Sequence, residues 1–453
     1  MKIPTLYFSD GTLILENWKE KTKPPFFQRD PRTQTWRALA RYYSHIIDAC
    51  KQKGISLQDK ARAFPPLNLQ MKVDYELYKY QEEGIAAWQQ SGCCGSVILP
   101  TGSGKSLLAM TAMASINAST FVVAPTIDLM NQWYDRLTDV FGMEVGILGG
   151  GYHEIKSLTV STYDSAYRYM DMYGNRFQLL IFDEIHHLPA PSYVQIPELS
   201  IAPYRLGLTA TYECTDAQHH KLENLIGPVV YKKRIKDLKG QHLSEYEIHR
   251  IHITLTPQEK AEYDNLAESY KHYVREKGIR FYGRKWETFI QESSYVPEAR
   301  KAMLAREKMR RILFSADRKM EALESVLKLH HKDRVIIFTL ANDLVYSIST
   351  QYLIPAITHQ TKTVERKAIL KRFRQGEYRF IVTSKVLNEG VDVPEANVAV
   401  ILGGTASPLE HIQRLGRILR KKSGKKAHLY EIVTGSTQET GISYRRRDSD
   451  AYS

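Results

Sequence analysis

Short, uninterrupted apolar runs alternate with amphipathic segments over two stretches of the chain. The first stretch extends from about Leu77 to Tyr231, and the second begins at Arg334. Runs that are apolar at every position are typical of parallel strands buried on both faces, and their alternation with helices is typical of α/β domains. The predicted strands are Ser96–Leu99, Thr120–Ala124, Leu158–Ser161, Leu179–Phe182 and Arg205–Leu208, followed by Val335–Phe338, Phe380–Thr383 and Val398–Leu402.

Residues 1–72 follow a different pattern. The apolar segments Leu6–Phe8 and Thr12–Leu15 flank a Ser-Asp-Gly sequence, which predicts a hairpin turn. Apolar residues then recur at helical spacing from Trp36 to Cys50, and Gly54 predicts the end of that helix. Because two prolines at 65–66 indicate a linker, we expect a small α+β module ahead of the first α/β domain.

The pattern between the two α/β stretches is helical. Thr256 and Glu259 form a capping-box sequence with Pro257 at the first helical position, and a second helix with six basic residues is predicted at Pro297–Phe314. We therefore expect three domains, residues 1–72, 73–240 and 241–453, with a helical insert at 256–315 in the last.

Composition narrows the class of partner. The 453 residues carry a net charge of +13 at pH 7, which favours a polyanionic ligand such as nucleic acid, although a basic surface without a ligand gives the same count. The four cysteines show no metal or disulfide spacing, which is typical of reduced thiols in the cytoplasm. No apolar run reaches membrane-spanning length, and the N-terminus is no signal peptide. We expect a soluble cytoplasmic protein that associates with the nucleoid and not with a membrane.

A glycine-rich loop follows the first predicted strand of the first α/β domain and precedes an apolar helix. Small residues let backbone N–H groups surround phosphates, and a helix N-terminus favours negative charge. Lys105 would contact the terminal phosphates of ATP, and the Ser106 hydroxyl would bind Mg²⁺. An ordinary glycine turn is the alternative, because Leu99 stands where the strict phosphate-loop pattern begins with glycine. The loop consists of Thr101, Gly102, Ser103, Gly104, Lys105 and Ser106.

An acidic pair follows the apolar run Leu179–Phe182. Charged residues that end a core strand lie at the edge of the sheet where ligands bind. We expect Asp183 to bind Mg²⁺ and Glu184 to polarise the attacking water. A surface acidic pair is one alternative, and a metal site formed by His186 with His187 is another.

The order of these motifs resembles a superfamily-two helicase. Along the chain stand YQ (80–81), GSGKS (102–106), APT (124–126), STYD (161–164), DEIH (183–186), TAT (209–211), IFT (337–339), NEGVDVP (388–394) and QRLGRILR (413–420). The strings DEIHHLPAPSYVQ and SIAPYRLGLTAT resemble more narrowly the short prokaryotic XPB helicases of nucleotide excision repair. The segment PPFFQRDPRTQTWRALARYY resembles the damage-recognition module of that family. The resemblance implies two RecA-like motor domains with parallel sheets, and a thumb at the position of the helical insert, although the insert could instead only brace those domains.

The resemblance also implies roles for further residues. Gln81 and Asp392 would lie near the nucleotide, and Arg417 and Arg420 would be arginine fingers that contact its γ-phosphate. Hydroxyl groups would bind the DNA backbone, although each could instead be a helix cap or a turn residue. These DNA-contact residues are Thr126, Thr162 and Thr383. The residues that would couple hydrolysis to domain movement are His186, Thr209, Thr211 and Gln413.

The chain departs from the family at two places. Tyr78 stands where relatives have an arginine ahead of the Tyr-Gln motif. Cys214 and Thr215 stand where relatives have the first two residues of an Arg-Glu-Asp loop implicated in strand separation, and only Asp216 remains. The ATP-site motifs are unaffected, which predicts robust DNA-stimulated hydrolysis with weak unwinding by the isolated protein.

The function implied by the resemblance is that of an ATP-dependent 3′–5′ DNA helicase or translocase that opens DNA around damage. Its ligands would be ATP, Mg²⁺ and forked, bubble or damaged DNA, and it would act as a monomer or as a heterodimer with a structure-specific repair nuclease. An alternative is an ATP-regulated DNA-binding scaffold that positions such a nuclease and unwinds little. The motor subunit of a restriction enzyme is a third possibility, and it is disfavoured by the lack of nuclease or methylase segments. Strand separation measured against ATP hydrolysis distinguishes the first two.

Overall fold

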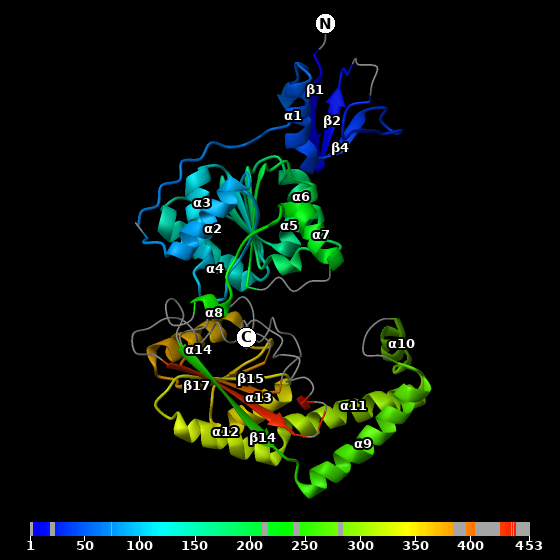
Figure 1. The fold of residues 1–453 in the computed structure, drawn as a ribbon, viewed down its shortest axis with the longest axis vertical. Coiled ribbons are helices and arrows are strands. Elements are labelled where there is room, and N and C mark those ends of the chain that lie inside the picture. The colour runs from blue at the N-terminus through cyan, green and yellow to red at the C-terminus, as the bar shows by residue number, and fades with distance from the viewer. Residues whose placement is uncertain are drawn as a thin grey trace. The chain divides into compact units, whose positions relative to one another are not determined.

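The computed structural model describes residues 3–18, 23–73, 75–210, 216–238, 245–279, 284–384, 396–403, 426–435, 437 and 439–440. These residues form two compact units that divide between Asp237 and Leu238. The first unit contains a small N-terminal module and the first α/β domain, and the second contains the second α/β domain with its helical insert (Figure 1).

The N-terminal module is a five-stranded sheet with one covering helix. Its strands β1 and β2 form the predicted antiparallel hairpin, whose turn residues Asp10 and Gly11 have φ values of 48° and 70°. Two successive positive φ values match the twist of a two-residue hairpin turn. The order is β3-β4-β2-β1-β5, with β1 Thr5–Ser9, β2 Thr12–Glu16, β3 Gln28–Arg29, β4 Trp36–Leu39, the 3₁₀ turn η1 Ala40–Tyr42, α1 Tyr43–Gln52 and β5 Gln58–Lys60.

The helix predicted from Trp36 begins later than expected. Residues 36–39 form strand β4, where Trp36 pairs with Leu15 of β2 and Leu39 pairs with Thr12. Pairing with an existing hairpin satisfies the backbone of this segment, so the sheet overrides its helical spacing. Helix α1 begins at Tyr43, and Gly54 has a φ of 64° just after its end.

The module contacts the first α/β domain directly. The Gly11 backbone N–H donates to the Asp171 carbonyl at 3.0 Å, and a Cβ at Gly11 would lie 2.7 Å from Leu199 Cδ2. Ile201 packs within the module's own hydrophobic core. Residues 61–73, which include the predicted proline linker, lack helix and strand, and the Lys72 N–H donates to the Val140 carbonyl at 2.8 Å.

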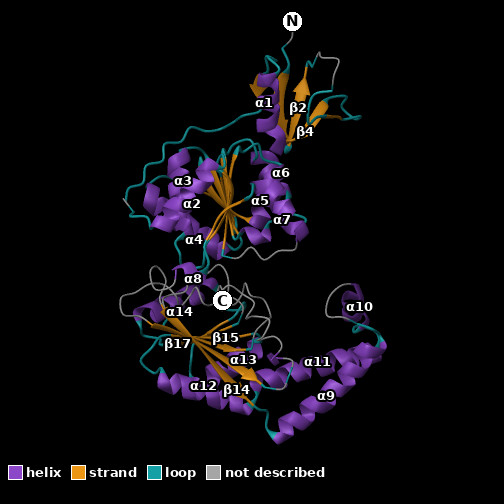
Figure 2. Ribbon diagram, viewed as in Figure 1, coloured by secondary structure: helices purple, strands orange, loops and turns teal. Residues whose placement is uncertain are grey.

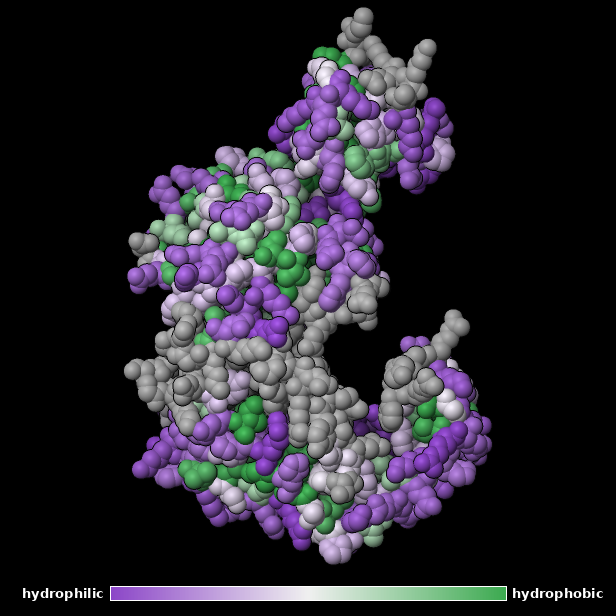
Figure 3. Space-filling model, in the orientation of Figure 1, coloured by the Kyte–Doolittle hydropathy of each residue, from purple (hydrophilic) through white to green (hydrophobic). Residues whose placement is uncertain are grey.

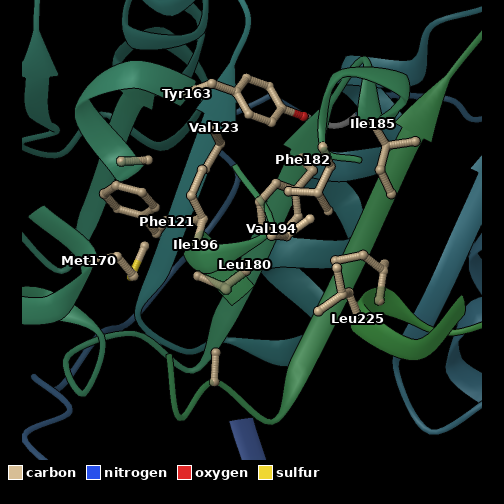
Figure 4. Packing of buried hydrophobic residues seen from close by; sticks show 14 of the residues in the cluster. Phe121, Val123, Tyr163, Met170, Leu180, Phe182, Ile185, Val194, Ile196 and Leu225 are labelled. Atoms are coloured by element: carbon tan, nitrogen blue, oxygen red, sulfur yellow. The ribbon is translucent and has the colours of Figure 1, made fainter. Parts of the chain in front are cut away.

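The first α/β domain is built on an eight-stranded sheet in the order β13-β6-β12-β11-β7-β10-β8-β9, parallel except for β9. All five predicted strands are confirmed, and β8, β9 and β13 were not predicted. Figure 4 shows side chains from the neighbouring strands β7 and β11, such as Phe121 and Phe182, packed in the core. The strands are β6 Cys94–Ile98, β7 Thr120–Ala124, β8 Gly146–Gly149, β9 Tyr152–Glu154, β10 Leu158–Thr162, β11 Leu179–Asp183, β12 Tyr204–Thr209 and β13 Val229–Lys232. The helices are α2 Lys79–Gln90, α3 Lys105–Ile116, α4 Ile127–Phe141, α5 Tyr163–Tyr173, η2 Ile185–His187, α6 Gln195–Glu198, α7 Asp216–Ile226 and α8 Ile235–Leu238.

The second α/β domain has a six-stranded sheet in the order β14-β19-β18-β15-β17-β16, with parallel pairing throughout. The three strands predicted here are confirmed, and β14, β16 and β19 were not predicted. The strands are β14 Glu245–Ile253, β15 Val335–Thr339, β16 Ala356–Ile357, β17 Phe380–Thr383, β18 Val398–Leu402 and β19 Lys426–Thr434. The helices are α12 Asp317–Leu329, α13 Asn342–Tyr352 and α14 Thr363–Gln375.

The insert between β14 and α12 is helical, as predicted. Helix α9 (Pro257–Glu276) begins with the expected capping box between Thr256 and Glu259, and α11 (Pro297–Ser315) runs beside it (Figure 2). Helix α10 (Arg284–Glu292) was not predicted. Apolar and tyrosine side chains form a separate core between these helices, and the outer face is largely hydrophilic (Figure 3). Within the described part of the chain, every helix is too short or too polar to cross a bilayer.

Candidate active site

The glycine-rich loop lies between β6 and α3, as the sequence predicts. Gly102 and Gly104 have φ values of 85° and 82°, which glycine adopts without the penalty that a side chain carries. A Cβ at Gly104 would lie 2.4 Å from Gln81 Nε2. The backbone conformation therefore favours glycine at position 104, and a side chain there would displace the Gln81 amide.

Helix α2 braces this loop from the side. The Ser103 carbonyl accepts hydrogen bonds from Tyr80 Oη at 2.7 Å and from Gln81 Nε2 at 3.0 Å. Gln81 is buried, and its Oε1 accepts from the Tyr78 backbone N–H at 2.9 Å. The structure thus places Gln81 against the backbone of the predicted phosphate loop.

Polar groups at the start of α3 match the chemistry of a triphosphate and a divalent cation. Lys105 Nζ donates to the Leu99 carbonyl at 3.2 Å, and Ser106 Oγ accepts from Arg136 Nη1 at 3.0 Å. Thr101 Oγ1 is buried with no hydrogen-bond partner among the described residues. A buried hydroxyl without a partner is costly unless a ligand satisfies it. An ammonium group, hydroxyls and a helix N-terminus are the groups that bind phosphates and Mg²⁺.

Asp183 ends β11 as a buried carboxylate. Its Oδ2 accepts a hydrogen bond from the Trp133 indole N–H at 2.9 Å, and its Oδ1 accepts from the Glu184 N–H at 3.1 Å. Burial and the Glu184 charge raise the pKa of Asp183, while the Trp133 bond and the Lys105 ammonium act in the opposite direction. The influence of Lys105 shows that the predicted phosphate-binding lysine lies within electrostatic reach of the predicted metal ligand.

Glu184, His186 and Thr209 form one polar network. Thr209 Oγ1 lies 3.3 Å from Glu184 Oε2 and 3.1 Å from His186 Nδ1, and His186 Nδ1 lies 3.5 Å from the same Glu184 oxygen. Strand β12, which ends at Thr209, lies between β6 and β11 in the sheet. The network is therefore assembled at the same sheet edge as the loop. Glu184 has a φ of 50°, a left-handed conformation that costs free energy for a residue with a side chain.

The three threonines predicted to contact DNA have local partners. Thr126 caps α4 by accepting from the Leu129 N–H at 3.3 Å, and Thr162 caps α5 by accepting from the Ser165 N–H at 3.2 Å. Thr383 is buried, and its hydroxyl donates to the Ser384 carbonyl at 3.2 Å. The structural alternative for each is thus present, and DNA contact by these residues stays a prediction. A capped helix still presents backbone N–H groups at its first turn.

Five predicted site residues lie outside the described residues: Thr211, Asp392, Gln413, Arg417 and Arg420. The departures Cys214 and Thr215 also lie outside them. Sequence reasoning missed Trp133, although the helical spacing of Met130, Trp133 and Leu137 indicates a buried face of α4. That spacing predicts burial but does not reveal which strand end the indole meets.

Comparisons with known proteins agree on one class. Residues 6–61 match the model of the xeroderma pigmentosum group B helicase damage recognition domain, residues 74–214 that of the type III restriction enzyme res subunit, and residues 318–422 that of the helicase conserved C-terminal domain. The chain is 39% identical over 416 residues to the DNA 3′-5′ translocase XPB2 of Sulfurisphaera tokodaii, covering 92% of this chain and 94% of the relative. It is 30% identical over 412 residues to the DNA 3′-5′ helicase XPB of Mycobacterium tuberculosis, covering 85% and 68%.

Solved structures share the fold at low sequence identity. The Pyrococcus furiosus Hef helicase domain superposes with a TM-score of 0.53 at 18% identity, covering 82% of this chain and 98% of that one. Dbp5 from S. cerevisiae, bound to RNA and ADP BeF3, gives a TM-score of 0.56 at 13% identity, with coverage of 83% and 88%. Together with the matches to the family models, this shared fold shows that the two α/β domains are RecA-like helicase domains.

Proposed function

Because the chain belongs to the XPB family of DNA helicases and translocases, we propose that it uses ATP to move in the 3′–5′ direction along DNA and to open the duplex around damage. The observation that carries this proposal is the network of Glu184, Thr209 and His186 beside the phosphate loop. A carboxylate held by a hydroxyl and an imidazole is positioned to orient an attacking water. Glu184 and His186 follow β11 and Thr209 ends β12, so the network links two neighbouring strands and can couple a change at the phosphates to both.

The residues of the first domain divide the chemistry of hydrolysis between them. Lys105 supplies a point charge for the terminal phosphates, and the backbone of residues 101–104 supplies N–H groups. Ser106 and Asp183 would hold Mg²⁺, which when bound neutralises the charge on the phosphate oxygens. Cation binding favours the ionised Asp183, because it offsets the burial that raises the pKa of this carboxyl.

Residues of the second α/β domain are proposed to complete the ATP site, together with Thr211 of the first. Arg417 and Arg420 are proposed as arginine fingers, with Asp392 near the nucleotide and Gln413 and Thr211 as coupling residues. Their motif positions in the sequence support these roles. We propose residues 73–240 and 241–453 as the two motor domains, 1–72 as the damage-recognition module and 256–315 as a thumb. Replacing either arginine with alanine should leave ATP affinity similar and lower turnover about 10³-fold, as for arginine fingers generally.

DNA is proposed to bind through its backbone. The N-termini of α4 and α5, capped by Thr126 and Thr162, and the backbone around Thr383 are the proposed contacts. Helix N-termini attract phosphates without reading bases. The net charge of +13 supports a binding free energy that depends strongly on salt and weakly on sequence.

ATP hydrolysis and DNA movement should be measured with matched variants. Lys105→Ala should abolish DNA-stimulated hydrolysis, whereas Glu184→Gln should retain ATP binding and lose turnover, because the proposed metal ligands remain. Glu144→Gln, at an exposed carboxylate in the same domain, is the control that should behave like the wild type. Translocation is read from displacement of a third strand from triplex DNA, with tails of either polarity. Wild-type hydrolysis in Lys105→Ala, or displacement that ignores polarity, would sink the proposal.

A scaffold that positions a nuclease remains the second candidate function. The observation in its favour is the sequence departure at Cys214 and Thr215, where relatives carry Arg-Glu. Under this reading, hydrolysis is robust but strand separation on forked DNA is weak until a structure-specific repair nuclease is added. Co-elution with such a nuclease on a sizing column, as a heterodimer, tests the partner. Strong unwinding by the isolated monomer rules this second function out.

A further inference from the structure

Three side chains of metal-binding type gather on one face of the second sheet. Strand β14 (labelled in Figure 1) pairs with β19, with Glu247 opposite His428 and His249 opposite Tyr430. Residues two apart on a strand share a face, and so do paired residues on neighbouring strands. Glu247, His249 and His428 therefore face the same side, near the amino ends of both strands. Asp183, Thr209 and Thr383 each stand at the carboxyl end of a strand, so this cluster at the amino ends of β14 and β19 is separate from those predicted site residues.

The distances between the three ligand atoms fit one coordinated ion. His249 Nε2 lies 3.1 Å from His428 Nδ1, and Glu247 Oε2 lies 3.5 Å from the first nitrogen and 3.6 Å from the second. In a tetrahedral zinc site with bonds of about 2.0–2.1 Å, two ligand atoms are roughly 3.3–3.4 Å apart. We propose that Glu247, His249 and His428 bind a divalent transition-metal cation, Zn²⁺ by preference, with water as the fourth ligand.

The donor set selects the class of metal. Two imidazoles and one carboxylate suit zinc and its neighbours in the transition series, whereas Mg²⁺ and Ca²⁺ prefer sites made of oxygen alone. The three side chains are 36%, 24% and 43% exposed for His249, His428 and Glu247. This exposure lets an ion enter and leaves room for a water ligand.

Neighbouring side chains hold the ligands in place before any ion arrives. The His249 ring stacks on Tyr430 with a centroid distance of 4.6 Å, and the Tyr430 hydroxyl lies 2.8 Å from His330 Nε2. Support of this kind fixes ring orientation and strengthens a metal site.

A pair of hydrogen-bonded imidazoles beside an acid is the competing interpretation. The separation of 3.1 Å between the two nitrogens suits a hydrogen bond as well as a shared ion. The carboxylate decides between them. The Glu247 oxygen lies 3.5 and 3.6 Å from the two nitrogens, which is too far for a good hydrogen bond to either. Both distances are close to the separation of two ligand atoms in a tetrahedral zinc site.

The ion acts as a cross-link at the base of the helical insert. β14 is the edge strand of its sheet, and the chain passes from its end at Ile253 to the α9 cap at Thr256 within three residues. A cation held by β14 and β19 fixes this edge strand to its neighbour. Zinc therefore stabilises the strand on which the insert is mounted.

Zinc binding is tested on the full chain after chelator treatment, in buffer that contains excess Mg²⁺. Titration with zinc chloride against a chromophoric chelator should give one tight equivalent, and X-ray absorption should report two imidazole ligands. Zinc should also raise the melting temperature of the protein. His249→Ala and His428→Ala should each weaken zinc binding by about tenfold or more. His252→Ala is the matched control, because this exposed histidine lies on the opposite face of β14.

The outcomes separate the site from a general effect on folding. Melting temperatures of the zinc-free variants show whether each alanine protein folds, and Glu247→Gln carries the test if either does not. Zinc binding that is absent in the wild type, or that survives equally in the ligand variants and in His252→Ala, overturns the proposal.

Discussion

The hydrogen bond between Trp133 and Asp183 offers a direct test of the candidate active site. Trp133→Phe keeps an aromatic ring on the buried face of α4 and removes the indole N–H, which lies 2.9 Å from Asp183 Oδ2. The donor stabilises the ionised form of the carboxyl and so lowers its pKa. Without it, the pKa of Asp183 rises further, because the effects of burial and of the Glu184 charge remain.

The size of the effect follows from the kind of bond that is lost. A hydrogen bond to a charged group contributes about 1.5–3 kcal/mol, and each 1.4 kcal/mol is about a factor of ten in an equilibrium. At acidic pH, where a proton competes with the cation for Asp183, the Mg²⁺ concentration that half-saturates ATP hydrolysis should therefore rise about tenfold or more. The acidic limb of the pH–rate profile should move to higher pH, since a larger fraction of Asp183 is protonated at each acidic pH.

The control is a second buried tryptophan in the same domain. Trp88 donates its indole N–H to the Arg205 carbonyl at 3.0 Å, so Trp88→Phe loses a comparable hydrogen bond away from the loop. Both variants should lose stability, because each leaves a void and a buried acceptor without its donor. Hydrolysis measured across Mg²⁺ concentration and pH should change only in Trp133→Phe. If the two variants show the same Mg²⁺ dependence, Trp133 does not act on Asp183 as the proposed metal ligand.

Further changes test other contacts. Asp183→Asn should raise the melting temperature near pH 7, since a carboxyl whose folded pKa is raised contributes stability only at low pH; the gain should vanish below about pH 4. Thr209→Val should lower kcat about fivefold to tenfold with similar ATP affinity, measured by steady-state kinetics, because the hydroxyl beside His186 is lost. Glu439→Gln should cost about 3–5 kcal/mol in a denaturant titration, since it leaves the buried Lys319 ammonium without its carboxylate, and Lys319→Met with Glu439→Leu should recover part of this loss. DNA affinity should fall steeply between low and moderate salt.

The strands that the sequence predicted correctly share one physical property. Thr120–Ala124 and Val398–Leu402 are buried at every position, because helices cover both faces of a parallel sheet. Uniform burial requires uniform apolar character, which is visible in the sequence. β14 lies at the sheet edge and carries Glu247, His249 and Arg250. Polar and charged residues therefore interrupt its apolar residues, and the sequence shows no uniformly apolar run here.

The misassigned segment at Trp36–Leu39 shows where local pattern fails. Its apolar residues continue the helical spacing of helix α1, which begins at Tyr43. The segment is a strand because β2 offers it a row of backbone hydrogen bonds, and the paired residues of β2 lie 21 to 27 positions earlier in the chain, from Leu15 with Trp36 to Thr12 with Leu39. Spacing along the chain does not contain this information.

The parts of the candidate site that are continuous in sequence could be predicted, and the partners that come from other elements could not. The loop at residues 101–106 and the pair Asp183–Glu184 are each continuous in sequence, and each follows a predicted strand. Their partners come from other elements: Tyr80 from α2, Trp133 from α4 and Thr209 from β12. Which residue meets which strand end depends on the order of strands in the sheet, and that order is not written in any single motif.

The acidic pair also shows why a functional site resists prediction from stability rules. Asp183 is a buried carboxyl whose pKa is raised by burial and by its neighbour, and Glu184 adopts a left-handed backbone conformation. Each feature destabilises the folded protein, and neither would survive if stability alone selected the sequence. Asp183 lies within electrostatic reach of Lys105, where a cation and a phosphate chain would supply the compensating charges. Glu184 holds this left-handed conformation while its carboxylate contacts Thr209 and His186, so the strained residue is also the one at the centre of the proposed catalytic network.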